Sequence, residues 1–417
     1  MRVAMVGTRG VPARYGGFET CVEEVGRRLV EAGHEVVVYC RPPEGERAVD
    51  QPDEYLGMEL VHLPAVRHRV LETLSHTAVS MLHRSISDVD CAIVFNAGNA
   101  PLIPVLRAHG IPVATHVDGL EWRRSKWSGV GRRYYRAVES LAVRWSDALI
   151  ADAAGIADYY RTEFAAPTDL IAYGAPIITD AASDRIAELD LEPKGYHLVV
   201  SRFEPENHVL EIVRGYVASS STLPLVVVGS SPYGLEYTAE IEAAADPRVR
   251  LLGAVWDQDQ LDQLYANALS YVHGHSVGGT NPSLLRATGA GAYVIAYDCI
   301  FNHEVLNGDG DYFRTPEEVG TLLVAAEQEP AQAVALGSFA REAVRRYDWD
   351  DVADRYEALC VRIVAGHGRR GGRRPTGRRV GSWSETAISS SASSDPDGHG
   401  PGASGSPGAV DRYDARV

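Results

Sequence analysis

The chain has 417 residues, 45% of them hydrophobic, and a formal net charge of −16. A chain of that length is too long to fold around one ordinary hydrophobic core, so we expect two domains of roughly 150–200 residues each, with additional segments. A chain with this negative charge has no net positive field to attract the phosphates of a nucleic acid, which argues against a nucleic-acid-binding protein. The five cysteines lack metal-ligand spacing, no window supplies the ~18–20 apolar residues that cross a bilayer, and the N-terminal apolar run is too short for a signal peptide. We expect a cytoplasmic protein, with any membrane contact peripheral, at the inner face of the plasma membrane.

In the first half of the sequence, short apolar runs alternate with amphipathic stretches. Buried strands are predicted at residues 2–6, 36–39, 91–95, 112–115 and 148–151. A helix is predicted at residues 19–32, where apolar positions recur with helical spacing and Gly33 closes the last turn. This alternation predicts a parallel, doubly wound sheet with right-handed crossovers.

The first predicted strand leads into the loop GTRGVPARYGGFET. Its glycines do not follow the G-x-G-x-x-G pattern, so the fingerprint of a nicotinamide site is absent. The pair Gly16 and Gly17 precedes a helix, where backbone amides can approach an anion or a sugar hydroxyl closely. A flexible turn without a ligand is the alternative. Arg9, Arg14 and Tyr15 favour a ligand, because a turn alone does not need them.

The fourth predicted strand leads into THVDGLEWRRSKW. His116, Asp118 and Glu121 are expected just past the carboxyl end of that strand, where catalytic groups of this architecture collect. Asp118 could accept a hydroxyl proton or cap a helix, and His116 could be a base or an ordinary buried histidine. The bases and aromatics at 122–136 suit a membrane interface or a lipid-phosphate acceptor, with a solvated helix face as the alternative.

The second half repeats the pattern after a predicted hinge at residues 174–194, where the alternation of strands and helices is interrupted. Strands are predicted at 196–200, 223–228, 249–252, 269–273 and 292–296, and helices at 208–217 and 261–266. Two tandem Rossmann-like domains follow, with a cleft between them that the carboxyl ends of both sets of strands face. From about residue 366 the chain is basic, then rich in Ser, Gly and Pro, and is expected to be a disordered, solubilising tail. Contact between its arginines and acidic lipid or nucleic acid is the alternative.

Two loops of the second half are suited to anions. Arg202 directly follows a predicted strand, where a cation can meet a diphosphate. Asn281 is a good N-cap before Pro282, so a helix begins there, and Gly279 and Thr280 come directly before the cap. Free amides at this positive helix end provide a second anion site. Two such loops on one sheet edge suit a nucleoside diphosphate.

The motifs RGVPARYGGFET, VDGLEWRRSKW, IADAAGIADYY, SRFEPENH, HGHSVGGTNPSLL and YDCIFNHEVL occur in this order. With them the chain resembles a retaining nucleotide-sugar glycosyltransferase of family 4 with the GT-B fold, and more narrowly a bacterial rhamnosyltransferase-like subgroup. The resemblance covers residues 1–362. It implies an acceptor domain at 1–175, a nucleotide-sugar domain at 176–347, a helix at 348–365 that crosses back to the first domain, and the tail at 366–417.

The resemblance implies transfer of a sugar from a nucleoside diphosphate donor to a glycan or polyprenyl-linked acceptor, with retained anomeric configuration and without metal or cofactor. Arg202 and the helix end at Thr280 and Asn281 would stabilise the departing diphosphate. In the family's usual description the leaving phosphate takes the acceptor's proton. Gly16, Gly17 and Asp118 would lie near the reacting centre.

The chain departs from the family pattern at positions that bear on donor binding. Two glutamates that the family carries eight positions apart would fall on Gly278 and Arg286, and a basic residue would fall near Asn207. Arg286 cannot accept hydrogen bonds from ribose hydroxyls as a glutamate would. We expect it to contact the donor phosphates or a ribose oxygen. A nucleotide-sugar-binding protein without transferase activity and a nucleotide-sugar 2-epimerase are the alternatives.

Overall fold

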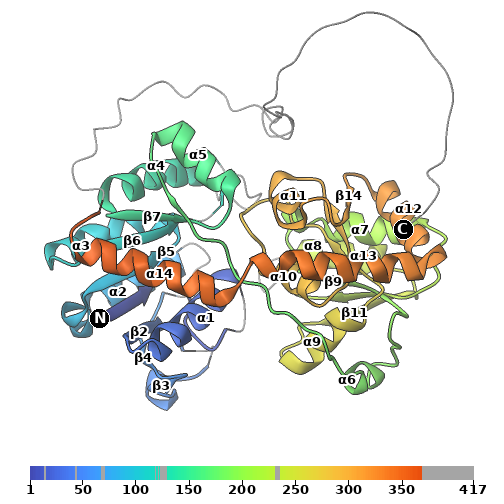
Figure 1. Cartoon of the computed structure of the whole chain (residues 1–417), viewed down its shortest axis with the longest axis horizontal. Coiled ribbons are helices and arrows are strands. Elements are labelled where there is room, and N and C mark those ends of the chain that lie inside the picture. The colour runs from blue at the N-terminus through green and yellow to red at the C-terminus, as the bar shows by residue number, and fades with distance from the viewer. Residues whose placement is uncertain are drawn as a thin grey trace, which may run out of the picture. The chain divides into compact units, whose positions relative to one another are not determined.

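The computed structural model describes residues 1–13, 16–42, 45–66, 71–117, 119–120, 122, 129–230 and 235–368. These residues form two sheets built from consecutive halves of the chain, with helices packed against them (Figure 1). The predicted tail at 366–417 falls almost entirely outside the described residues. None of the described helices has both the length and the apolar character needed to cross a bilayer.

The first sheet has the strand order β3-β4-β2-β1-β5-β6-β7-β8, and every pair is parallel except β3 with β4. β1 lies between β2 and β5, so the chain winds away from β1 in both directions. Such a reversal opens a crevice at the carboxyl ends of the two strands that flank it. The strands are β1 (Arg2–Val6), β2 (Glu35–Cys40), β3 (Glu54–Tyr55), β4 (Met58–His62), β5 (Cys91–Phe95), β6 (Val113–Val117), β7 (Ala148–Ala151) and β8 (Asp169–Leu170).

Amphipathic helices cover the first sheet. In α1 the buried side chains recur at helical spacing, at Cys21, Val22, Val25 and Leu29, which places one face of the helix on the sheet. The helices of this half are α1 (Gly17–Glu31), α2 (Leu71–Leu82), α3 (Ile103–Ala108), α4 (Gly129–Trp145) and α5 (Ala154–Phe164). A 3-10 turn, η3 (Ala97–Leu102), follows β5 and packs against α4.

The second sheet has the order β11-β10-β9-β12-β13-β14, with all pairs parallel and the reversal between β9 and β12. Its strands are β9 (His197–Val200), β10 (Leu225–Val228), β11 (Val249–Gly253), β12 (Ser270–His273), β13 (Tyr293–Tyr297) and β14 (Asp311–Phe313). Its helices are α6 (Asp184–Ala187), α7 (Val209–Ala218), α8 (Leu235–Ala244), α9 (Gln258–Asn267), α10 (Pro282–Gly289), α11 (Ile300–Leu306), α12 (Pro316–Gln328) and α13 (Pro330–Ala343).

The last helix, α14 (Trp349–Val364), returns to the first half and packs on α1, as the resemblance implies (Figure 1). Tyr356 is fully buried there, with its hydroxyl 3.4 Å from the Cys21 thiol. At the crossing point the amide of Ala175 donates to the carbonyl of Tyr347 at 2.7 Å, and Gly174 lies against the indole of Trp349. The two segments that join the halves therefore pair with each other.

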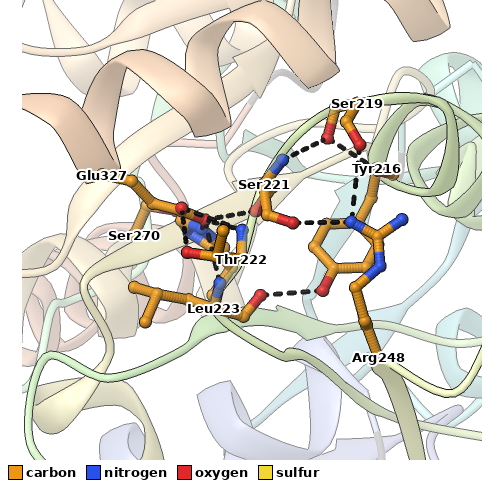
Figure 2. A network of polar contacts seen from close by, with 9 residues as sticks. Tyr216, Ser219, Ser221, Thr222, Leu223, Arg248, Ser270 and Glu327 are labelled. Atoms are coloured by element: carbon orange, nitrogen blue, oxygen red, sulfur yellow. Dashed lines mark hydrogen bonds and ion pairs between the residues drawn. The ribbon is translucent and has the colours of Figure 1, made fainter.

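A polar network at the amino edge of the second sheet connects α12 to the segment before β10 (Figure 2). The carboxylate of Glu327 accepts hydrogen bonds from His197 Nε2 at 3.0 Å, from the hydroxyl of Ser221, from the amide and hydroxyl of Thr222, and from the amide of Leu223. Beside it Arg248 lies over the ring of Tyr216 and donates to the carbonyl of Ser221 at 2.6 Å. Because it lies at the edge opposite to the strands' carboxyl ends, this network serves stability.

The predicted doubly wound architecture is confirmed, and the buried strands lie where their apolar runs place them. The prediction missed the short or edge strands β3, β4, β8 and β14, which are too short or too polar to stand out. It also ended β6 two residues too early. His116 therefore lies within the strand and not past its end.

Candidate active site

The carboxyl edges of the two sheets face each other through closely packed loops. A Cβ atom on Gly119, after β6, would lie 2.3 Å from the Cα of Gly278, after β12. The next residue, Gly279, leaves equally little room, because a Cβ there would lie 1.9 Å from the carboxylate of Asp152, after β7. The hydroxyl of Thr280 donates to the carbonyl oxygen of Asp152 at 2.5 Å. Close packing therefore favours glycine at 119 and 279, whereas at 278 a Cβ would meet the His275 ring at 2.8 Å.

The N-terminus of α10 opens into this region. The Asn281 side chain caps the helix by accepting from the amide of Ser283 at 2.9 Å, and Pro282 is its first residue, as predicted. Gly278 has φ of 138°, a conformation that suits glycine. Within the described residues the amides of Gly278, Gly279 and Thr280 donate no hydrogen bond to a carbonyl. Free amides at the positive end of a helix bind anions.

Arg202 follows β9 at the same sheet edge. Its guanidinium forms no hydrogen bond or ion pair with any described side chain, and the residue is half-buried. Its carbonyl oxygen accepts from Asn207 Nδ2 at 2.8 Å, and Asn207 Oδ1 lies 2.6 Å from His275 Nδ1. Asn207 is thus buried as a brace between the loops after β9 and β12. The brace orders the loop that carries this uncommitted cation.

The residues of the first half that were predicted to act are only partly described. His116 is fully buried, stacked between the rings of Phe95 and Tyr173, and burial lowers its pKa to about 3. It is therefore neutral at physiological pH. Asp118 and Glu121 lie outside the described residues.

The predicted acceptor loop is described apart from Arg14 and Tyr15. The amide of Arg9 donates to the carboxylate of Glu19 at 3.0 Å, and Gly16 has φ of 111° before the first turn of α1. A Cβ on Gly17 would lie 3.2 Å from Pro282 of α10, so the N-termini of α1 and α10 meet. The glycine pair thus lies opposite the diphosphate site that is predicted in the second half.

Comparisons with known proteins show what the chain is similar to. Residues 16–174 match the family model of the glycosyl transferase 4-like domain. No curated protein sequence matches the chain at a significant level. Sucrose-phosphate synthase from Thermosynechococcus elongatus is similar in structure, with a TM-score of 0.72 and 18% identity over 88% of this chain and 99% of that chain. HepE from Anabaena, in complex with UDP-glucose, gives a TM-score of 0.69 and 16% identity over 87% and 100% of the two chains.

The similarity extends to further solved structures. A TarM mutant from S. aureus, in complex with Fondaparinux, alpha-GlcNAc-glycerol and UDP, gives a TM-score of 0.67 and 10% identity over 86% of this chain and 99% of that chain. Each of these similarities covers 86–88% of this chain. The chain has the GT-B fold. At such low identity the likeness concerns the fold, and the site chemistry has to be argued from this chain's own residues.

In this GT-B chain Arg286 has an internal partner. Its guanidinium forms an ion pair with the carboxylate of Asp262, on the neighbouring helix α9, and Gln258 donates to the same carboxylate oxygen at 3.1 Å. Both charged residues lie four positions after the first residue of their helix, about 6 Å along each axis from its start. The counter-charge on α9 gives a physical reason for an arginine at this position. Its expected contact with the donor stays a prediction.

Two residues at the sheet edges were not singled out from the sequence. Asp152 directly follows β7 and is buried against Gly279. Glu304 of α11 accepts a hydrogen bond from the amide of Ala154 at 2.7 Å, at the start of α5 in the other half. Burial raises the pKa of Glu304, and the amides of Ala154 and Gly155 oppose that shift. The position of Asp152 after an apolar strand was a usable signal, whereas nothing in the sequence pairs Glu304 with α5.

Proposed function

We propose that the chain is a retaining glycosyltransferase, which moves a sugar from a nucleoside diphosphate to a glycan or lipid-linked acceptor, with rhamnose as the first donor sugar to test. One observation carries the proposal: the uncommitted Arg202 lies at the same sheet edge as the free amides of the α10 N-terminus. Across from them lie the glycine pair of α1 and the buried ring of His116. A donor would place its diphosphate on the second half and its sugar toward the first.

The reaction breaks the bond between the anomeric carbon and a diphosphate oxygen, and the acceptor oxygen forms the new bond to that carbon. The acceptor's proton goes to the departing diphosphate, so no protein carboxylate pair is required. Arg202 and the α10 amides stabilise the negative charge that develops on the leaving group. His116 is neutral and fully buried between Phe95 and Tyr173, which suits it to supporting the end of β6 from within and not to contacting the sugar. The role of Asp118 stays a prediction.

A second candidate is a nucleotide-sugar-binding protein without turnover. It is favoured by Arg286, which stands where the family carries a glutamate that binds the ribose. The nearby carboxylate of Asp262 does not replace that glutamate, because Arg286 and Gln258 already engage it. Both candidates predict donor binding, and they differ in product formation.

The test is a panel of nucleoside diphosphates and their sugars. Because a true donor binds the folded state alone, at least one member should raise Tm in proportion to the logarithm of its concentration. Release of nucleoside diphosphate, measured chromatographically with and without EDTA, then separates an enzyme from a binding protein. Proton NMR of the glycoside product reads its anomeric configuration. A panel in which no nucleoside diphosphate binds contradicts both candidates.

A further inference from the structure

A cluster of charged and polar side chains lies outside the donor site, at the carboxyl edge of the first sheet. Arg41 directly follows β2, and Arg9 lies in the loop after β1; the two are joined by a hydrogen bond of 2.9 Å from the Arg41 amide to the Arg9 carbonyl. Glu72 and His76 come from the first two turns of α2. The cluster adjoins the predicted acceptor loop, because Glu19 of α1 accepts from the Arg9 amide.

The carboxylate of Glu72 forms ion pairs with both Arg41 and Arg9. Its Oε2 lies 3.3 Å from Arg41 Nη1 and 4.0 Å from Arg9 Nη2, and Arg41 Nη2 donates to the hydroxyl of Thr73 at 3.2 Å. The Arg41 side chain is 8% exposed. A guanidinium taken so far out of water needs acceptors for its donors, since a buried donor without a partner has lost its hydrogen bonds to water and gained none in exchange.

The described part of the chain does not supply hydrogen-bond acceptors for all the donors of Arg41. Nε of Arg41 and Nδ1 of the fully buried His76 are buried without a hydrogen-bond partner, and Nη1 of Arg41 has the ion pair with Glu72 but no aligned hydrogen bond. His76 Nε2 lies 3.1 Å from the carbonyl oxygen of Cys40, and burial and Arg41 lower the pKa of this histidine to about 4. A neutral imidazole that donates from Nε2 presents Nδ1 as an acceptor. The cluster therefore offers two cationic donors and one neutral acceptor.

This combination selects a ligand by its chemistry. The arginine donors require anionic oxygens, and the histidine acceptor requires a hydroxyl nearby. A carboxylate such as Glu72 supplies the first and not the second. A phosphate bonded to a sugar or a glycerol supplies both, and arginine suits phosphate oxygens. Buried polar groups without partners in a native structure are an indication of such a missing ligand.

We propose that Arg41, with Arg9 and His76, binds a phosphate group carried by the acceptor, and that Glu72 occupies the arginines when no acceptor is bound. This inference rests on the proposed function, because it defines the acceptor class of that transferase. The phosphate has two potential sources, a free sugar phosphate and a lipid headgroup. In both, the same oxygens meet the same arginines.

The experiment uses the full chain with its donor site first saturated by UDP or by whichever nucleoside diphosphate the panel selects. Glucose 1-phosphate is then titrated by calorimetry at constant ionic strength, with glucose as the uncharged comparison. Binding is expected for the phosphate compound, weakened at least tenfold by Arg41→Gln and strengthened at least threefold by Glu72→Gln. Arg47→Gln is the matched control, because Arg47 is exposed and pairs with Asp50 on the surface of the same half.

A parallel arm sediments the same variants with phosphatidylcholine vesicles, with and without phosphatidylglycerol. Binding that depends on Arg41 in either arm supports the proposal, and the arm that responds identifies the source of the phosphate. The proposal is overturned if Glu72→Gln and Arg41→Gln both bind like the unmodified chain, or if neither probe binds. Should Arg41→Gln fail to fold, the gain expected for Glu72→Gln still decides. Failure of the nucleoside diphosphate to bind would instead contradict the proposed function.

Discussion

Two arginines of the second half show that the surroundings of a residue decide whether its charge is available to a ligand. Arg202 has no partner among the described side chains, and it follows β9 at the same sheet edge as the loop before α10. Arg286 has a carboxylate on the neighbouring helix. In the sequence both were candidates for the donor phosphates. The structure favours Arg202, because a cation without an internal counter-charge gains most from an incoming anion.

Arg202→Gln should weaken binding of the nucleoside diphosphate about 10–100-fold, since a hydrogen bond to a charged group contributes about 1.5–3 kcal/mol. Calorimetric titration of the diphosphate selected by the panel measures this. Arg214→Gln, on the exposed face of α7, should bind normally and serves as the control. Equal affinity in both variants would remove Arg202 from the donor site.

Glu327 is a residue whose contribution is to stability (Figure 2). Burial opposes its ionisation, but hydrogen bonds from His197, Ser221 and Thr222 outweigh burial and hold its pKa well below the ordinary value of 4.5. A depressed folded-state pKa contributes stability that is present above pH 4.5 and is lost as pH falls below that value. Glu327→Gln should lower the free energy of unfolding by about 2–4 kcal/mol at pH 7.

Calorimetric Tm as a function of pH checks this prediction for Glu327. The difference in Tm between the variant and the unmodified chain should be largest at neutral pH and should shrink below pH 4.5. Glu342→Gln, whose carboxylate pairs with Arg345 at the surface, is the comparison and should change Tm little. A difference in Tm that does not vary with pH would show that the negative charge of Glu327 does not contribute to stability.

At the scale of elements, the loop before α10 is shaped by its contact with the other half. Gly119→Ala adds a Cβ 2.3 Å from the Cα of Gly278, so the loops after β6 and β12 have to separate. We expect transfer activity to fall at least tenfold, because misplacement by about 1 Å at a site can cost about 10²-fold in rate. Gly129→Ala is the control, since a Cβ there meets nothing within 4 Å. Steady-state rates that are unchanged in Gly119→Ala would show that the loops move apart freely.

The elements also show where sequence periodicity succeeds. β1, β5 and β7 lie where their apolar runs place them, because both faces of a parallel strand are buried and the run is continuous. The end of β6 was misjudged because His116 reads as a loop residue although it is buried among aromatic rings. Strands such as β3 and β14 have too few residues for any pattern.

At the scale of the molecule, α14 ties the end of the second half to the first. Tyr356 is fully buried against α1, so Tyr356→Ala should lower stability by about 3–5 kcal/mol through the cavity that it leaves. Tyr356→Phe keeps the packing and loses the hydroxyl contact with Cys21, so it should cost much less. Chemical denaturation with tryptophan fluorescence measures both. Equal losses in the two variants would assign the effect to the hydroxyl.

The sequence by itself determined the two doubly wound halves, the helix start at Asn281 and Pro282, and the glycine loops. Each of these depends on local rules of burial, capping and backbone freedom. The tertiary structure decided which charges are committed. It paired Arg286 with Asp262, left Arg202 open, placed Asp152 against Gly279, and brought Arg41 to Glu72 and His76. Such contacts join residues far apart in the chain, and their energies depend on burial and distance, which no local pattern contains.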